Sequence, residues 1–404
     1  MRREATGRCV FFGFGGLNMA SLLNTLSSIG IAYISGVPDS VLEPFLVELN
    51  GLPNIEHQVA ACEGSAVALA AGRSVASKRP CGVYMQNSGL PNALNPLLSM
   101  FSPNVYDIPL TLIVGWRGEP GTKDEPQHMV MGRITESMLG LLETDPMIVG
   151  AETAHESVRG YILERLQNRR HAALLVRRNA FKGTRQPASA TDPRASNFKE
   201  SVDRVVAVNA ILESIRDGSV VFSSIGYTAR EVMLYEGAHR RQRFAHLPCV
   251  GGMGFASSFA AGASGADTNR DVYCIDGDGA FLMHGLSNSV IPAQRGRFKH
   301  IVLNNSCHNS VGGFATCSVA ADLTKIAEGM GYAWCKRVTD VRDLRPALHE
   351  LASHTLPVFL EVRCGLQSFG NLPRPDRPLS DYKNDFLATM EARDDRDQVF
   401  QVQQ

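Results

Sequence analysis

The stretch from Asp271 to Asn305 constrains the fold of this chain more than any other. It begins with a short apolar run that is typical of a buried strand and that ends at Gly277-Asp278-Gly279. A helical segment follows, and then a second apolar run that ends at an Asn-Asn pair. In a βαβ unit both strands finish at the same carboxyl edge of a parallel sheet, where such folds bind ligands. The stretch therefore predicts a parallel α/β sheet with a ligand site at this edge.

The residue types at the two strand ends indicate what the ligand is. Asp278 offers a carboxylate and Asn305 a side-chain carbonyl, and both are the hard oxygen ligands that Mg²⁺ prefers. The glycine turns leave backbone N–H groups free for phosphate oxygens. The alternative is an ordinary turn at the end of a strand, where Asp and Gly are common. Because both motifs occur at neighbouring strand ends, we favour a site for Mg²⁺ and a diphosphate.

The rest of the chain predicts two domains of the same kind. Apolar runs alternate with helical stretches from residue 17 to 181 and again from residue 201 to 390, which is typical of doubly wound parallel sheets. Residues 182–200 are polar, with Gly, Pro, Ser and Thr, and indicate a linker. The 404 residues leave room for two or three domains. We expect two α/β domains, with no middle domain between them.

Composition excludes several classes of partner. Forty basic and forty acidic residues cancel, so there is no charge excess that would indicate nucleic-acid binding. No segment approaches the roughly 20 apolar residues of a membrane span. The nine cysteines include no C-x-x-C pair, which argues against a disulfide framework or a zinc site. We expect a cytoplasmic protein without nucleic-acid or membrane partners.

The Gly-Asp-Gly and Asn-Asn pair resembles the fingerprint of thiamine-diphosphate enzymes. The resemblance implies thiamine diphosphate and Mg²⁺ as cofactors, with the metal held by Asp278, Asn305 and the backbone carbonyl of Cys307. It also implies a pyrimidine-binding domain followed by a diphosphate-binding domain. Enzymes of this type place the cofactor between the first domain of one subunit and the second domain of another. We therefore expect a homodimer or higher homo-oligomer with shared active sites.

Further residues match the cofactor site of these enzymes. Glu63 begins a helix of small residues, and an acid in a first turn is commonly a response to the helix dipole alone. The resemblance instead implies that Glu63 protonates N1′ of the aminopyrimidine. It implies that Met253 holds the cofactor bent, although a core methionine needs no such role. The resemblance assigns other cofactor contacts to Gly226, Gly251, Gly277, Gly279 and Ala280.

Longer segments narrow the resemblance to one family. The segments GVPDSVLEPF, EGSAVALAAG, YMQNSGLPNALNPLLS and GWRGEPGTKDEPQH closely resemble the phosphonopyruvate decarboxylases, of which the sulfopyruvate decarboxylases are near relatives. The resemblance implies decarboxylation of 3-phosphonopyruvate, a small anionic 2-oxo acid, to phosphonoacetaldehyde and CO₂. The alternatives are decarboxylation of sulfopyruvate or another 2-oxo acid, and a non-catalytic relative that binds the cofactor. A nicotinamide oxidoreductase is disfavoured because the Gly-x-Gly-x-x-Gly fingerprint is incomplete. Phosphonate biosynthesis and phosphonate catabolism would both use such a reaction.

Three strand ends of the first domain carry hydroxyls, amides and charges that a dianionic substrate needs. The candidates for proton transfer, beside Glu63, are Asp39, His128 and His308. The candidates for substrate binding are Ser40, Asn87, Arg117 and Lys123. The chain also departs from the family at Pro91, Asn309 and Phe314, where the family usually has Gly, Asp and Gln. Asn cannot ionise and Phe cannot bind a charged head group, so we expect these changes to affect substrate identity and rate.

Overall fold

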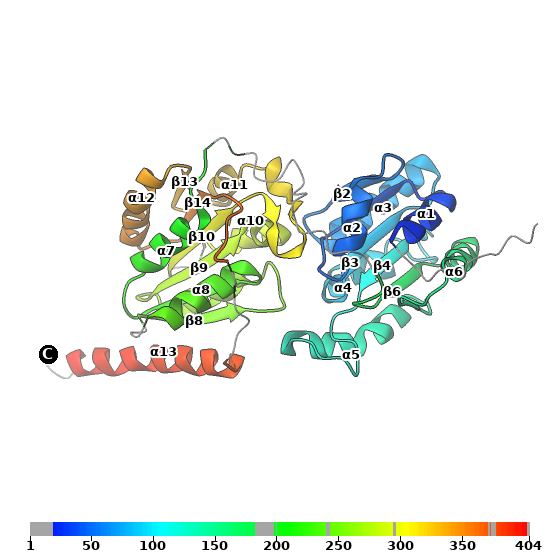
Figure 1. Cartoon of the computed structure of the whole chain (residues 1–404). Helices are drawn as coiled ribbons and strands as arrows, with labels where there is room; N and C mark the ends of the chain where they lie inside the picture. Colours follow the sequence, from blue (N-terminus) through cyan, green and yellow to red (C-terminus); the bar gives the residue numbers. More distant parts are fainter. Residues whose placement is uncertain are drawn as a thin grey trace, which may run out of the picture.

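The computed structural model describes residues 19–181, 198, 200–239, 243–293, 296–370, 372 and 377–401. The chain forms two lobes, and each is built on a six-stranded parallel sheet (Figure 1). We call residues 19–181 the first lobe and residues 200–401 the second lobe. The prediction of two doubly wound α/β units is confirmed. The predicted linker lies almost entirely outside the described residues.

The sheet of the first lobe has the strand order β2-β1-β3-β4-β6-β5. Its strands are β1 (Tyr33–Gly36), β2 (Glu56–Val59), β3 (Gly82–Gln86), β4 (Thr111–Gly115), β5 (Met147–Val149) and β6 (Ala172–Val176). Its helices are α1 (Met19–Ser28), α2 (Glu43–Asn50), α3 (Glu63–Ser77), α4 (Leu90–Leu98), α5 (Pro126–Gly140) and α6 (His155–Gln167), with a 3-10 turn η1 (Asn87–Gly89) before α4. Apolar side chains of α1, α2 and α6 pack on one face of the sheet. Those of α3, α4 and α5 pack on the other.

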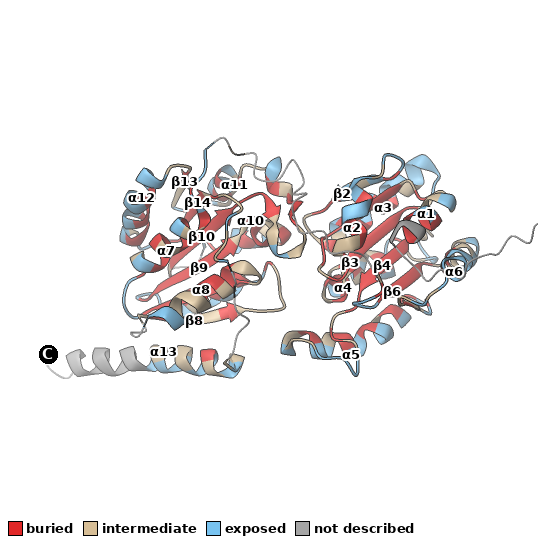
Figure 2. Ribbon diagram, viewed as in Figure 1, coloured by how far each residue is buried: buried red, intermediate tan, exposed pale blue. Residues whose placement is uncertain are grey.

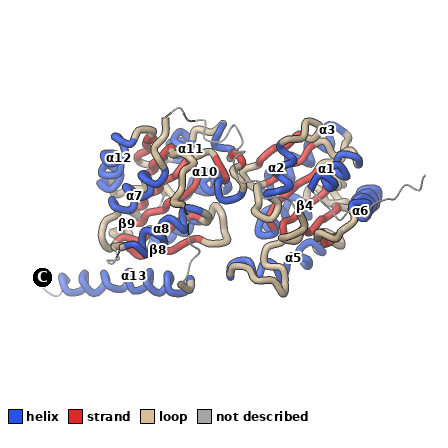
Figure 3. The backbone as a smooth tube through the Cα atoms, viewed as in Figure 1, coloured by secondary structure: helices blue, strands red, loops and turns tan. Residues whose placement is uncertain are grey.

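The sheet of the second lobe has the order β13-β14-β10-β9-β7-β8. Its strands are β7 (Ser219–Ser224), β8 (Phe244–Cys249), β9 (Asp271–Gly277), β10 (Arg297–Asn304), β13 (Trp334–Val338) and β14 (Val358–Arg363). Its helices are α7 (Arg204–Ser214), α8 (Tyr227–Ala238), α9 (Ala256–Ala266), α10 (Asp278–Met283), α11 (Leu323–Met330), α12 (Val341–Ser353) and α13 (Leu379–Gln401). Helices α7, α8 and α12 cover one face, and α9, α10, α11 and α13 cover the other (Figure 3).

Both sheets are buried between their helices, while the outer sides of the helices are exposed (Figure 2). Strands β4 and β6 are buried at every position. Since helices cover both faces of a parallel sheet, such strands need apolar side chains in both directions. This is why they appear in the sequence as continuous apolar runs. The strands of each sheet run parallel, so their carboxyl ends meet at one edge.

The second lobe contacts the first through the segment of residues 307–319. This segment contains a small hairpin of β11 (Cys307–His308) and β12 (Phe314–Ala315), and the 3-10 turns η3 (Asn309–Val311) and η4 (Cys317–Val319). Phe314 is 3% exposed and belongs to the apolar cluster of the first lobe that includes Leu42 and Tyr84. The thiol of Cys317 donates to the carbonyl of Val59, at the end of β2. The hairpin therefore fixes the carboxyl edge of the second sheet against the first lobe.

Two expectations from composition can be compared with the structure. In the described part of the chain, no helix combines the length and the apolar character that a membrane crossing requires. The cysteines that the structure describes are all free.

We predict that Phe314→Ala destabilises the protein by about 3–5 kcal/mol, because it removes a buried aromatic ring from the contact between the lobes. The measurement is the free energy of unfolding in urea. Leu141→Ala is the control, since Leu141 is 61% exposed and its truncation should change stability by less than about 0.5 kcal/mol. Equal effects of the two substitutions would contradict the role of Phe314.

Candidate active site

A cavity of about 400 Å³ lies between the two lobes, at the carboxyl edges of both sheets. The first lobe contributes residues that follow β1 and β3, together with the start of α3. The second lobe contributes the loops that follow β7, β8, β9 and β10. The volume lies within the range of about 300–1,000 Å³ that is usual for small-molecule sites. One chain thus supplies both walls of a site large enough for a cofactor, whereas the family resemblance implies walls from two subunits.

Glu63 forms part of the wall from the first lobe. It is the first residue of α3 and is 5% exposed. Burial raises the pKa of its carboxyl, and the hydrogen bond that Asn92 Nδ2 donates to Glu63 Oε2 (2.8 Å) opposes that rise. A Cβ atom on Gly89 would collide with the Glu63 carboxylate, so the close approach depends on this glycine. A carboxyl in such an environment holds its proton more tightly than an exposed one does.

Asp278 and Asn305 lie at neighbouring strand ends of the second lobe, as the sequence predicts. Both line the cavity and are almost fully buried, at 2% and 4% exposure. Thr316 Oγ1 and Ser318 Oγ (2.8 Å) donate to Asp278 Oδ2. Burial raises the pKa of Asp278, and these two bonds oppose the rise because they favour the ionised form. The side-chain oxygens of Asp278 and Asn305, together with the backbone carbonyl of the nearby Cys307, are ligands that fit a hard cation such as Mg²⁺.

The start of α8 offers backbone donors to the cavity. Gly226 stands at its N-cap with φ +97°, and no side chain caps the helix. Tyr227 and Thr228, in its first turn, line the cavity. The first N–H groups of a helix lack partners within the helix, and the positive end of the helix dipole favours anions. The turn from Gly277 to Ala280 also lines the cavity, so the phosphate contacts expected from the sequence lie together.

The loop after β8 brings Met253 into the cavity lining. Positive φ angles at Gly251 (+80°) and Gly254 (+84°) turn the backbone on either side of it. A Cβ atom on Gly279 would lie 3.4 Å from the Met253 Cε atom and 2.8 Å from His308 Cε1. Met253 thus approaches the Gly-Asp-Gly turn closely, and only glycine at position 279 leaves room. Met253 therefore lines the same cavity as Gly279 and Glu63.

A second group of the predicted residues lies in the first lobe, beside the cavity but not among its lining residues. Arg117 is the centre of this group. Its guanidinium forms a bidentate ion pair with Asp124, at 2.6 and 2.8 Å, and donates to Ser40 Oγ at 3.2 Å. The side chain of Asn87 bonds the backbone N–H and carbonyl of Arg117. The carboxylate of Asp124 therefore offsets the positive charge of Arg117, which the sequence analysis proposes for substrate binding.

Asp39 belongs to the same group. It is 1% exposed, and its Oδ2 accepts the N–H groups of Val41 and Leu42 at 3.1 Å each. Its Oδ1 has no hydrogen-bond partner among the residues that the structure describes. Burial raises the pKa of this carboxyl to about 6, against the opposing effects of those bonds and of Arg117. For His128, burial and the nearby Arg117 lower the pKa.

The remaining predicted residues divide between the cavity and the surface. His308 lines the cavity, and burial lowers its pKa to about 4, so the ring is neutral at pH 7. Asn309 and Pro91 also line the cavity, and Asn309 Nδ2 donates to the carbonyl of Leu366 at 3.0 Å. Lys123 is exposed and belongs to neither group. Phe314, by contrast, packs between the lobes and is not a lining residue.

Sequence reasoning missed several residues of the site. Asn92 bonds Glu63, Thr316 and Ser318 bond Asp278, and Arg204 lines the cavity from the start of α7. The two hydroxyls follow the Asn-Asn pair closely and could have been noticed as possible partners of a buried carboxylate. Arg204 lies outside the segments that resemble the family, and Asn92 lies within one of them without any sign of its partner. Their partners are 27 and 29 residues away.

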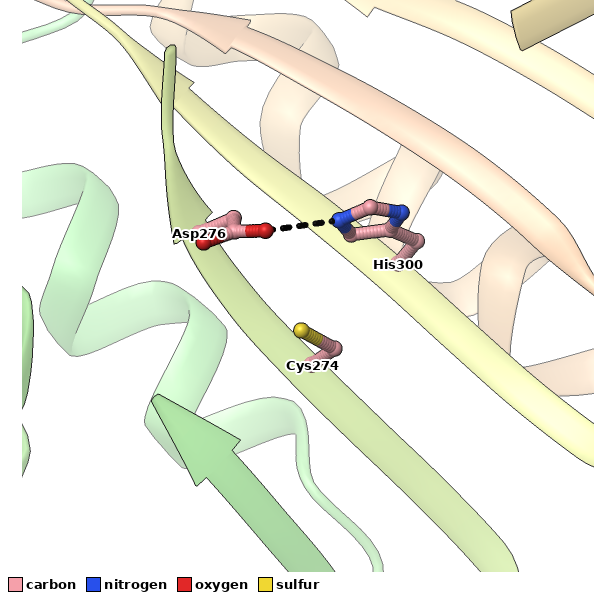
Figure 4. Close-up of side chains that lie close together, drawn as sticks. All are labelled: Cys274, Asp276 and His300. Atoms are coloured by element: carbon pink, nitrogen blue, oxygen red, sulfur yellow. Dashed lines mark hydrogen bonds and ion pairs between the residues drawn. The ribbon is translucent and has the colours of Figure 1, made fainter. Parts of the chain in front are cut away.

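A cluster of ligand-type side chains also occurs inside the second lobe, away from the cavity lining. Cys274 and Asp276 on β9 and His300 on β10 converge in the buried core (Figure 4). The His300 ring already bonds Asp276 Oδ2 (3.2 Å) and the Tyr332 hydroxyl (2.9 Å). Burial raises the pKa of the Cys274 thiol well above its ordinary value. We assign the cluster to the hydrogen-bonded core, because the imidazole is occupied and the thiol stays protonated.

Family comparison finds two matches that together span both lobes. Residues 19–138 match the thiamine pyrophosphate enzyme, N-terminal TPP binding domain. Residues 224–362 match the thiamine pyrophosphate enzyme, C-terminal TPP binding domain. The two matches contain Glu63 on one side and Asp278 with Asn305 on the other.

Characterised proteins with similar sequences include several decarboxylases. The chain is 31% identical over 379 residues to phosphonopyruvate decarboxylase of Streptomyces viridochromogenes, a match that covers 89% of this chain and 91% of that protein. It is 30% identical to phosphonopyruvate decarboxylase of Streptomyces hygroscopicus, with 89% and 90% covered. The chain is also 37% identical over 118 residues to the sulfopyruvate decarboxylase alpha subunit of Methanothermobacter thermautotrophicus. This shorter match covers 29% of this chain and 69% of that subunit.

We predict that Asp39 makes the protein less stable as pH rises from 5 to 8. Its pKa is about 6 in the folded state, against an ordinary value of 3.8, so in this window the folded state binds more protons than the unfolded state. Stability gained from protonated Asp39 is therefore lost through pH 6, by roughly 1–2 kcal/mol. Urea unfolding at several pH values should show this loss in the unsubstituted protein.

Asp39→Asn is the matched variant, because an amide cannot ionise. The difference in unfolding free energy between the two proteins should shift in favour of the variant by that amount between pH 5 and pH 8. Parallel pH profiles of the two proteins would show that Asp39 ionises normally in the folded state.

Proposed function

The chain belongs to the phosphonopyruvate decarboxylase family of thiamine-diphosphate enzymes, and we propose that it converts 3-phosphonopyruvate to phosphonoacetaldehyde and CO₂. The observation that supports this proposal most is that residues far apart in the sequence, from the first and the second lobe, line one cavity. Glu63 of the first lobe and the Asp278 and Asn305 pair of the second line the same space. Decarboxylation by such an enzyme needs a proton carrier facing a cofactor, and this arrangement supplies one.

We propose specific contacts for the cofactor and the metal. The diphosphate would lie against the first turn of α8 and the Gly277–Ala280 turn, with Mg²⁺ bound by Asp278, Asn305 and the Cys307 carbonyl. The pyrimidine would lie between Met253, the Gly251 carbonyl and Glu63. The corresponding domain limits are residues 17–181 for pyrimidine binding and residues 201–390 for diphosphate binding.

The reaction divides between the cofactor and the side chains. When bound, thiamine diphosphate supplies the nucleophilic carbon and the electron sink that decarboxylation requires. The raised pKa of Glu63 suits it to donate a proton to a ring nitrogen and to accept it again. His308 lines the cavity as a neutral imidazole, so it can accept a proton near the reacting carbon. Asp39 and His128 lie farther back, and we propose them as a proton reserve beside the cavity.

Substrate binding would use the side of the cavity next to the Arg117 group. We propose that Arg117, Ser40 and Asn87 attract the phosphonate, with Lys123 contributing charge from the surface. Asp124 already pairs with Arg117, so a phosphonate must share this guanidinium. Asn309 lies in the lining where the family usually has Asp, and it would contribute a hydrogen bond but no negative charge.

The second candidate function is decarboxylation of sulfopyruvate or another 2-oxo acid. The similarity to the alpha subunit of sulfopyruvate decarboxylase favours keeping it. A sulfonate carries one negative charge, whereas a phosphonate can carry two. An Arg117 already paired with Asp124 discriminates between them less than a free arginine would, so substrate preference has to be measured.

The working unit that we propose is a homodimer or a higher homo-oligomer. Exposed apolar side chains of the second lobe support this, because Phe259, Leu286 and Val290 are 56%, 84% and 56% exposed. Light scattering coupled to size exclusion, with and without cofactor, measures the assembly. A monomer under both conditions would rule it out.

The test of the function is CO₂ release by purified protein. The substrates are 3-phosphonopyruvate, sulfopyruvate and pyruvate, each with and without thiamine diphosphate and Mg²⁺. We expect release that needs both cofactors and that is fastest with 3-phosphonopyruvate. Preference for another acid would retain the mechanism and change the substrate. Cofactor binding without turnover would identify a non-catalytic relative.

We predict that Glu63→Gln lowers kcat for CO₂ release by about 10²–10⁴-fold, which is the usual contribution of a general acid or base. Gln can still accept the hydrogen bond from Asn92, so the fold should persist. Glu56→Gln is the control, because Glu56, on β2, forms an exposed ion pair with Arg73 of α3. A Glu63→Gln enzyme with unchanged kcat would remove Glu63 from the proposed mechanism.

We predict that Thr316→Val lowers the affinity of the site for Mg²⁺ by about 10–100-fold. This is the usual cost of losing a hydrogen bond to a metal ligand. The measurement is the Mg²⁺ concentration that supports half-maximal binding of thiamine diphosphate in calorimetry. Thr324→Val is a matched control, since Thr324 is buried and bonds Glu361 instead. Equal Mg²⁺ dependence of the two variants would contradict the role of Thr316.

A further inference from the structure

A buried ion pair joins α7 to α8 beside the cavity. Arg204, the first residue of α7, donates from Nε and Nη2 to the two carboxylate oxygens of Glu231 at 2.9 and 2.8 Å. Their side chains are 5% and 0% exposed. Arg204 also donates from Nη2 to Thr228 Oγ1 at 3.3 Å, in the first turn of α8. The guanidinium therefore fixes the turn that offers free N–H groups to the cavity.

The ion pair has a direction relative to the cavity. Arg204 and Thr228 are lining residues, whereas Glu231 is not. The positive end thus faces the cavity and the negative end lies in the interior. Arg204 is also the one permanent cation in the lining, within the part of the chain that the structure describes. The acidic lining residues are Glu63 and Asp278.

Stability alone explains this pair poorly. Removing two charges from water costs about as much as their attraction returns, and apolar residues of similar size often replace such pairs without loss. A bidentate arginine instead gives geometric precision to the groups it holds. The pair holds a helix start whose donors suit phosphate oxygens, so a role in anion binding accounts for it better.

We propose that Arg204, held by Glu231, is a positioning residue for the terminal phosphate of thiamine diphosphate. It orients Thr228 and the first turn of α8, and it supplies positive charge at that end of the cavity. The pair therefore makes the site prefer thiamine diphosphate over thiamine monophosphate. This inference rests on the cofactor of the family and does not depend on which 2-oxo acid is the substrate.

The test compares the dissociation constants of thiamine diphosphate and thiamine monophosphate, measured by calorimetry in the presence of Mg²⁺. The variants are Arg204→Met and the double variant Arg204→Met/Glu231→Leu. The double variant leaves no unpaired buried charge, so it should fold even where the single variant does not. We expect each folded variant to lose about tenfold or more in preference for the diphosphate, since charge-assisted hydrogen bonds are the strong ones.

Two controls separate positioning from general stabilisation. Arg270→Met removes another buried arginine, which pairs with Asp267 and does not line the cavity. It should lower the melting temperature and leave the preference unchanged. Arg204→Lys should restore part of the preference, because it returns the charge without the bidentate geometry.

Two results would overturn the proposal. One is a folded double variant that retains the wild-type preference for the diphosphate. The other is a variant that loses both ligands by the same factor, which is what a purely structural role predicts. Binding of thiamine diphosphate by a wild-type protein that leaves 3-phosphonopyruvate intact would refute the proposed substrate and would leave this inference untouched.

Discussion

The hydrogen bonds from Thr316 and Ser318 to the buried Asp278 carboxylate are the interaction on which the rest of the site depends. They favour the ionised form of a carboxyl whose pKa is raised by burial. The same segment carries Phe314, which packs into the apolar cluster of the first lobe. The state of the carboxylate and the placement of the opposite wall therefore depend on one short stretch of chain. This explains how a small hairpin outside both sheets becomes necessary to a site at their edges.

Sequence patterns predicted the buried strands well, because strands covered on both faces require continuous apolar runs. The runs at residues 172–176 and 358–363 match β6 and β14 residue for residue. The sequence patterns did not predict β5, because it is an edge strand of only three residues. They also did not predict α13, because this helix is too polar to show an apolar stripe. Helix α5 begins at Pro126, and the residues of its first turn are typical of a polar loop rather than of a helix.

The candidate site shows a similar division between local and distant information. Asp278 and Asn305 could be predicted together because a βαβ unit forces their strand ends to one edge. Arg204, Asn92 and Glu231 could not, because their contacts arise from the packing of helices rather than from a repeated spacing. The same limit applies to Asp39, whose burial the sequence does not reveal. Family resemblance supplied residue roles, while the structure supplied the partners that modify those residues.

The position of the cavity between two separately packed lobes has a consequence for the protein in a cell. A cofactor that contacts both walls binds the folded arrangement and not the unfolded chain, so its binding free energy adds to the free energy of unfolding. Protein that lacks its cofactor opens more often and is removed faster by proteases. The abundance of this protein would then follow the supply of the vitamin from which the cofactor is made, without any change in its synthesis.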